Sequence, residues 1–180
     1  MENGTILKLS EHLPHLETLH LDHLVFSSYD WLAHSPQSLT KLRMDRWNGT
    51  VELPSSLIHF RAGFVKLSAS SFVSSLPSSL QSWVTDAMVG VKLVVPLLPS
   101  TTHTFLGTTP ENSVEISLEE YRDLLEQLPK SLKRFQFLRS LYINFEEHPE
   151  LISLLPATLT ELHVDEPSLP CLVCGGQSSS

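Results

Sequence analysis

Apolar residues recur along this chain in a fixed rhythm that starts from a proline. The third residue after the proline is leucine or threonine, the sixth is leucine or aromatic, and the eighth is small, apolar or threonine. The units are anchored on Pro14, Pro36, Pro54, Pro77, Pro99, Pro129 and Pro156, and the first keeps the pattern one residue short. Successive anchors are 22, 18, 23, 22, 30 and 27 residues apart. This period predicts a protein built from one repeated unit.

The spacing of the sixth and eighth residues predicts a strand in every unit. Side chains alternate between the two faces of a strand, so positions separated by one residue share a face. The earlier leucine lies on the turn before the strand, where proline is tolerated because it has no backbone donor. Each unit is too small to bury its own apolar face, so neighbouring units stack. Replacing an inward leucine, Leu132 or Leu159, by alanine is therefore expected to cost about 2–5 kcal/mol.

Three segments carry a resemblance to a known repeat family. They are Leu53–Phe60 (Leu-Pro-Ser-Ser-Leu-Ile-His-Phe), Leu128–Phe135 (Leu-Pro-Lys-Ser-Leu-Lys-Arg-Phe) and Leu155–Val164 (Leu-Pro-Ala-Thr-Leu-Thr-Glu-Leu-His-Val). They resemble leucine-rich repeats and are most similar to the Leu-Pro-x-Ser-Leu variants, which include FNIP-type repeats. The resemblance runs from about Leu13 to Val164. It implies an α/β fold, a leucine-rich-repeat solenoid with a parallel concave β-sheet and an irregular, partly helical convex side.

The chain departs from the family pattern at one position of every unit. The usual motif has an asparagine five residues after the first leucine of the strand. This chain instead has Leu24, Trp47, Val65, Met88, Pro110, Ser140 and Pro167 there. The buried asparagine ladder of the family is therefore missing, and the Phe-Asn-Ile-Pro signature is absent as well.

Helices are predicted in the longer connections between strands. Ser117 and Glu120 form a capping box, and apolar residues then continue at helical spacing to Leu128. A shorter helix is expected from Pro149 to about Leu155, because proline is tolerated at the first helical position. Ser27–Leu32 is expected to form a single helical turn.

Composition and charge exclude several classes of protein. Residues 1–165 are expected to form one leucine-rich-repeat domain of about seven repeats, with a flexible tail at 166–180. The formal net charge of −8 disfavours nucleic acid, whose phosphates bind basic surfaces. No secretory signal is visible, and the most apolar window, Met88–Leu98, is too short for a membrane span. We expect a cytoplasmic protein with no membrane, nucleic-acid or small-molecule partner.

Motifs for catalysis or cofactor binding are absent from the sequence. There is no Gly-x-Ser-x-Gly elbow, no Gly-x-Gly-x-x-Gly segment and no Walker loop, so we expect no enzyme and no cofactor. Cys171 and Cys174 have the spacing of half a zinc knuckle, but zinc takes four ligands and no second pair exists. Four histidines crowd residues 12–23, although they come from both a loop and a strand. Zinc binding stays an alternative here, and no metal site is predicted.

The residues that point outward from the strands form columns, because parallel strands lie roughly 4.8 Å apart. One column contains His20, Arg43, Arg61, Val84 and Leu106. The next contains Asp22, Asp45 and Asp86. Arginine beside exposed apolar side chains is typical of interface hot spots. These eight residues are the predicted partner-binding site.

The favoured function is a non-catalytic scaffold that binds a protein partner through the concave sheet. Two alternatives are a structural fragment of a larger repeat protein and a substrate receptor like those of ubiquitin ligases. The second rests on analogy alone, because no F-box is visible. A further possibility is that the acidic convex helix, with Glu119, Glu120 and Asp123, carries the partner.

Overall fold

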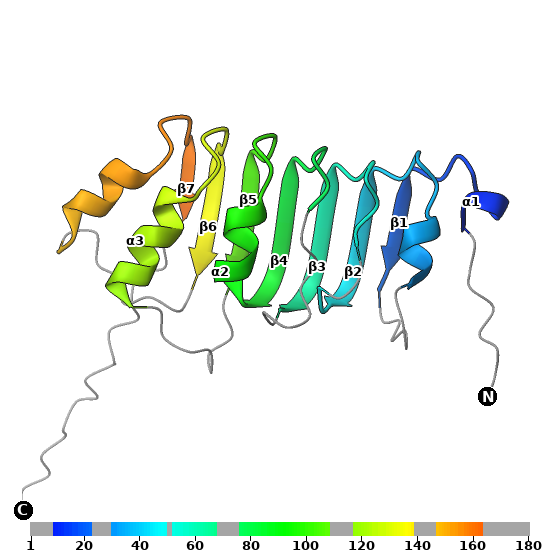
Figure 1. Ribbon diagram of the computed structural model, residues 1–180, viewed down its shortest axis with the longest axis horizontal. Coiled ribbons are helices and arrows are strands. Elements are labelled where there is room, and N and C mark those ends of the chain that lie inside the picture. The colour runs from blue at the N-terminus through cyan, green and yellow to red at the C-terminus, as the bar shows by residue number, and fades with distance from the viewer. Residues whose placement is uncertain are drawn as a thin grey trace, which may run out of the picture.

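The computed structural model describes residues 9–22, 30–49, 52–67, 76–108, 117–138 and 147–163. Its centre is a sheet of seven parallel strands that follow one another in sequence order (Figure 1). The strands are β1 (Thr18–Leu21), β2 (Lys41–Trp47), β3 (His59–Lys66), β4 (Ser82–Val89), β5 (Thr104–Thr108), β6 (Arg134–Leu138) and β7 (Glu161–His163). The helices are α1 (Leu9–His12), η1 (Asp30–His34), α2 (Val91–Val94), η2 (Val95–Leu97), α3 (Leu118–Glu126) and η3 (Pro149–Leu154). The predicted α/β class with a parallel sheet is confirmed.

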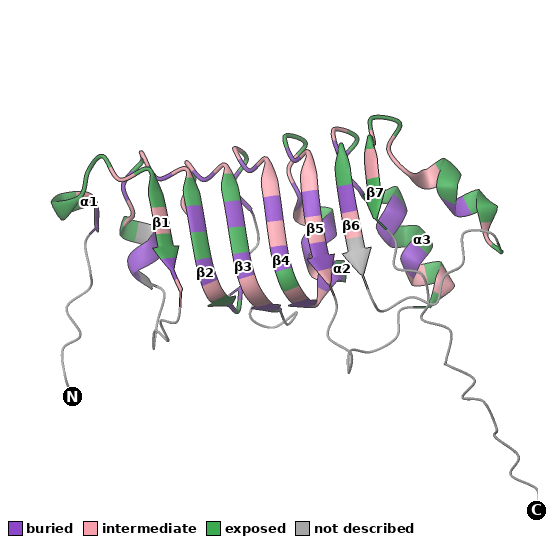
Figure 2. Ribbon diagram, turned by 180° about the vertical axis from the view of Figure 1, so that it is seen from behind, coloured by how far each residue is buried: buried purple, intermediate pink, exposed green. Residues whose placement is uncertain are grey.

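The sheet has one covered face and one open face. Figure 1 shows η1, α2 and α3 in front of the strands, and Figure 2, from behind, shows the strands in front of α2 and α3. We call the face opposite these helices the open face, and it is the face expected to be concave. Each described strand pairs only with its neighbours in sequence, and β1 and β7 lie at opposite ends of the sheet.

The same turn precedes each strand from β2 to β7. Proline opens the turn, and the backbone N–H of the third residue after it donates to the proline carbonyl. The pairs are Leu39–Pro36, Leu57–Pro54, Leu80–Pro77, Thr102–Pro99, Leu132–Pro129 and Leu159–Pro156, at 2.9–3.0 Å. In the shortened first unit Leu16 donates instead to Leu13, at 3.1 Å. Proline fits because the turn uses its carbonyl and needs no N–H from it.

A hydroxyl group two residues after each of these six prolines joins the turn to the preceding unit. Ser79 Oγ donates to the carbonyls of Ser55 and Leu57, both at 2.7 Å. Equivalent bonds are made by Ser38, Ser56, Thr101, Ser131 and Thr158. We call these bonds the hydroxyl ladder. It explains the serine of the Leu-Pro-x-Ser-Leu pattern, which the apolar rhythm alone leaves without a role.

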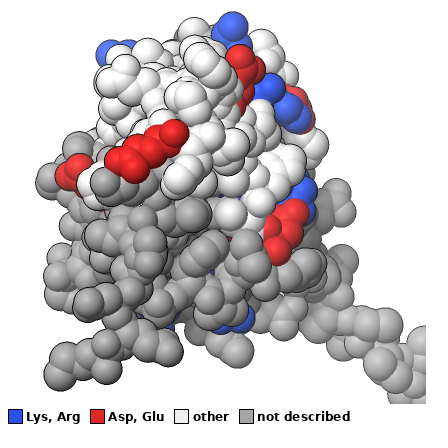
Figure 3. Space-filling view, turned by 90° about the vertical axis from the view of Figure 1, so that its right-hand side faces the viewer, with Lys and Arg blue, Asp and Glu red and all other residues white. Residues whose placement is uncertain are grey.

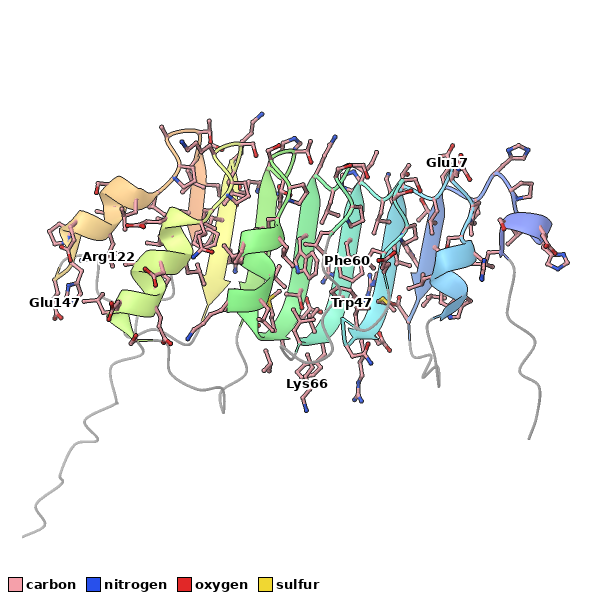
Figure 4. All side chains as sticks on the ribbon, viewed as in Figure 1. Glu17, Trp47, Phe60, Lys66, Arg122 and Glu147 are labelled. Atoms are coloured by element: carbon pink, nitrogen blue, oxygen red, sulfur yellow. The ribbon has the colours of Figure 1, made fainter. Side chains whose placement is uncertain are left out.

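The core lies between the sheet and its covered face. The inward residues at the sixth position of the units are at most 2% exposed in five successive strands. They are Leu42, Phe60, Trp83, Phe105 and Phe135. Trp47 joins Phe60 and Trp83 in an edge-to-face cluster with ring centroids 4.9–5.5 Å apart, and Figure 4 shows Trp47 and Phe60 side by side.

The last unit is less buried than the others. Leu132 is fully buried, as expected, but Leu159 at the same position of the next unit is only partly buried. The reason is that β7 has a neighbouring strand on one side only within the described residues. Leu159 is thus less enclosed than Leu132, and the energetic cost of removing either side chain stays a prediction.

The in-and-out alternation shifts by one residue in the three central strands. Beyond the shift, β2, β3 and β4 turn Trp47, Val65 and Met88 into the core, each at most 1% exposed. The backbones of β2 and β3 approach closely at the shift: a Cβ on Gly63 would lie only 2.9 Å from the Asp45 carbonyl oxygen. The positions that hold asparagine in the leucine-rich motif are therefore buried and apolar in these strands.

The predicted helices are present where the structure describes them. Ser117 caps α3 in a full capping box with Glu120. The helix predicted from Pro149 is η3, a 3₁₀ helix. The turn predicted within Ser27–Leu32 overlaps η1, although residues 27–29 lie outside the described part. Helices α2 and η2 were not predicted, because their almost uniformly apolar segment has no helical period. Of the described helices, none is long and apolar enough to cross a membrane.

Candidate functional site

The strand register assembles the main predicted column residue by residue. His20, Arg43, Arg61, Val84 and Leu106 are successive Cα partners across β1 to β5. None of these residues is buried, whereas on β2 to β5 the residues directly before and after each of them on its strand are buried. This column therefore lies on the open face. The structure therefore brings these five residues together, and their role in binding stays a prediction.

Arg43 and Arg61 are opposite each other in the register but turn to different sides. Arg43 Nε lies 3.0 Å from Asp22 Oδ1, and Arg61 Nη2 lies 3.1 Å from Asp86 Oδ1. The four side chains are 36–62% exposed, and exposed pairs of this kind contribute only about 0–1 kcal/mol. Figure 3, seen from the N-terminal end with the open face to the right, shows basic and acidic side chains lying together there. These weak pairs orient the guanidinium groups, and a partner's carboxylate can replace the aspartate at a small cost in free energy.

The three predicted aspartates are not equivalent. Asp22 and Asp86 contact arginines of the neighbouring column. Asp45 is half-buried, and its backbone carbonyl lies against Gly63 where the alternation shifts. Asp45 therefore lies where the alternation of β2 shifts, while the other two aspartates shape the charge around the arginines.

Half-buried apolar side chains continue the open face beyond the arginines. Val84 and Leu106 are Cα partners on β4 and β5, and both are partly exposed. Phe64 and Ala87 are partners just beyond the shift, and they too are partly exposed. Along the row of the column, the open face thus changes from Arg43 and Arg61 on β2 and β3 to Val84 and Leu106 on β4 and β5.

Four basic residues on β2 and β3 lie outside the predicted set. Lys41 and His59 are Cα partners at the amino ends of these strands, and Arg46 and Lys66 lie towards the carboxyl ends. Figure 4 shows Lys66 extending past the lower edge of the sheet. Burial and the positive charges of Lys41 and His103 lower the pKa of His59 below 6.5. Counting charge along each strand, rather than along each column, would have found this group.

At the C-terminal end of the open face, three charged or ionisable side chains contact one another. The Arg134 guanidinium contacts both carboxylate oxygens of Glu161, with Nη2 3.0 Å from Oε1. His163 Nε2 lies 2.7 Å from the same Oε1. The hydrogen bonds from Arg134 and then from His163 lower the pKa of Glu161 from 4.5 to about 2. This cluster is satisfied internally and offers less to a partner than β2 and β3.

No family model, curated protein or solved structure matches this chain.

The described residues contain no group of three or more histidine, cysteine, aspartate or glutamate side chains that could hold a metal ion. Cys171 and Cys174 lie outside the described part.

On the covered side, a groove of about 270 Å³ lies between α2, η2 and α3. Lys92 and Glu120 form an ion pair at this groove, and Leu124 and Val95 line it.

Proposed function

We propose that this protein is a leucine-rich-repeat solenoid that acts as a non-catalytic scaffold and binds a protein partner through the open face of its sheet. The repeat assignment is supported by six identical proline turns, by the hydroxyl ladder and by a parallel sheet in strict sequence order. Apolar residues at the asparagine position separate it from the usual motif. The cytoplasmic location and the absence of a cofactor stay predictions.

One observation carries the proposed function, the row Arg43, Arg61, Val84 and Leu106 on the open face. These residues come from four successive strands, so only the stacked units bring them together. Their side chains are accessible, and the described helices α2, α3 and η1 lie on the other face. Arginine beside apolar groups that a partner can desolvate is the composition of interface hot spots.

The covered side is the second candidate, because it has a groove and acidic side chains. Glu119 and Asp123 of α3 are exposed. However, Glu120 is already used by the cap of its own helix and by Lys92, and these contacts lower its pKa. The groove residues are thus committed to joining α3 to α2, which supports a structural role for this side.

Affinity capture with matched variants tests the proposal. The wild type, Arg43→Glu/Arg61→Glu and Glu119→Lys/Asp123→Lys are immobilised, and captured polypeptides are identified by mass spectrometry. We expect the arginine variant to lose the polypeptides that the wild type and the α3 variant retain. Unchanged circular dichroism and melting temperature establish that each variant is folded. Loss of capture by the α3 variant alone would place the binding site on the covered side.

A further inference from the structure

Strands β2 and β3 carry a concentration of positive charge on an acidic protein. Their basic residues are Lys41, Arg43, Arg46, His59, Arg61 and Lys66, all of them exposed, and we call this group the basic stripe. The two strands hold five Lys and Arg against one Asp, which gives 5 − 1 = +4, in a chain of net charge −8. The stripe is therefore a local reversal of the overall charge.

The arrangement of the stripe is unfavourable for folding alone. Arg43 is the Cα partner of Arg61 on the neighbouring strand. Like charges directly opposite each other on neighbouring strands are destabilising. Residues that break a rule of stable sheets in this way are expected at functional sites.

The stripe ends abruptly at β4. Strands β4 and β5 contain no lysine or arginine, and their one acid, Asp86, is paired with Arg61. Val84 and Leu106 follow Arg61 directly in the register. A ligand that crosses the strands along this row therefore meets two guanidinium groups and then two apolar side chains.

We infer that the open face selects an amphipathic helix of a partner protein, with acidic side chains over the basic stripe and apolar side chains over Val84 and Leu106. This inference rests on the proposed function and names the chemistry of the partner. A helix repeats every 5.4 Å or so, close to the roughly 4.8 Å between strands, whereas same-side residues of an extended chain lie about 6.6 Å apart. One helical turn can thus face each strand in succession.

The interleaved aspartates favour carboxylates over a phosphate backbone. Asp22 and Asp86 flank the two arginines, and Asp45 lies between them on β2. A polyanion with a charge at every residue would meet these acids, while a helix can place single carboxylates over the guanidinium groups. Arg43 contacts Asp22 through Nε, and Arg61 contacts Asp86 through Nη2. Both arginine side chains stay about half exposed, so further guanidinium N–H donors are available to a partner.

The test is a selection of random peptides on the immobilised full chain. Peptides of about 14 residues, four helical turns, suffice to cross four strands. Selected peptides are synthesised, and their binding is measured by fluorescence anisotropy against the wild type, Arg43→Glu/Arg61→Glu and Arg43→Gln/Arg61→Gln. Lys130→Glu/Lys133→Glu is the matched control, with the same charge change at exposed residues outside the stripe. Circular dichroism checks the fold of each variant.

We expect acidic, apolar peptides whose affinity falls roughly tenfold or more in both arginine variants, as hot-spot arginines do, and stays within about twofold in the lysine control. Added salt should weaken binding to the wild type, because exposed charges are screened. Neutral or basic peptides that still depend on Arg43 and Arg61 would overturn this inference and leave the open face as the binding surface.

Three other outcomes also contradict the inference. Peptides that bind all variants equally, or a selection that yields no binder, would contradict the proposed function itself, that the open face binds a protein partner. A 20-residue oligothymidylate probe, at about physiological salt, tests nucleic acid. If that probe binds as tightly as the best peptide and loses its binding in the arginine variants, the basic stripe is a binding site for the phosphates of a nucleic acid.

Discussion

The central and terminal strands of this sheet are built from the same motif but are held in different ways. At the sixth position of the unit, Trp83 of β4 is 0% exposed, whereas Leu162 of β7 is 37% exposed. Strand β4 runs for eight residues and β7 for three. The apolar motif alone thus does not determine how much stability a unit contributes, because burial depends on the neighbours.

The difference follows from one-dimensional stacking. A central unit is covered on both sides, while the described part of the last unit is covered only by β6. In repeat proteins stability is close to a sum of unit and interface terms, so a unit with one interface contributes less. At β7 the exposed side chains of Arg134, Glu161 and His163 contact one another on the open face.

The largest expected effect compares two leucines at the same position of adjacent units. Leu132→Ala should destabilise by about 2–5 kcal/mol, because it leaves a cavity in a fully buried site. Leu159→Ala should cost only about 1 kcal/mol, since this side chain is partly exposed and its site can be filled by water. Urea unfolding with unchanged m-values measures both. Equal losses would contradict the difference between central and terminal units.

A second prediction concerns the shift that only the long central strands reach. Gly63→Ala should destabilise by about 1–3 kcal/mol, as overpacking does, because the new Cβ meets the backbone carbonyl of Asp45 at 2.9 Å. A backbone atom cannot move aside as a flexible side chain can. Thermal melting measures the loss. An unchanged melting temperature would show that β2 and β3 are not held tightly at this point.

The parallel sheet was predictable because the apolar rhythm repeats in seven units. Alternation placed the column from His20 to Leu106, and the strand register reproduces it. The capping box at Ser117 likewise marked the start of α3, since caps are local interactions between residues close in sequence.

Other features could not be predicted because they depend on contacts between units. The partners of Arg43 and Arg61 lie on different sides, Asp22 just after β1 and Asp86 on β4. The alternation of β2 shifts at Asp45, where the sequence has no distinctive mark. The hydroxyl ladder was visible as a serine or threonine two residues after six prolines, yet its acceptors belong to the preceding unit. Helix α2 gave no periodic signal because it is one turn long.

A third prediction tests the hydroxyl ladder in the centre against a hydroxyl near the end. Ser79→Ala should cost about 0.5–1.5 kcal/mol, because two carbonyls of the preceding unit lose their donor. Ser153→Ala is the control, since its hydroxyl is exposed and bonds only within η3, to Glu150. We expect little change there. Chemical denaturation of both variants gives the comparison, and similar losses would mean that the ladder adds nothing specific to stacking.

The smallest expected effect is a pH dependence at the terminal charge cluster. The pKa of Glu161 lies at about 2 in the folded protein, below the ordinary value of 4.5. A lowered carboxyl pKa means that the ionised form favours the folded state, so this contribution is complete above pH 4.5 and is lost as the pH falls towards about 2. The melting temperature of the wild type should therefore exceed that of Glu161→Gln near neutral pH, and the difference should shrink below pH 4.5.

Repeating the Glu161→Gln comparison in an Arg134→Met variant separates this effect from the general loss of stability in acid. In Arg134→Met, the same Glu161→Gln substitution should give a smaller and flatter difference, because the main cause of the lowered pKa is gone and only His163 remains. Since the groups are exposed, salt should reduce the effect as well. A difference that persists unchanged at pH 2, or in the Arg134→Met background, would show that Glu161 acts through packing and that β7 is held as the central strands are.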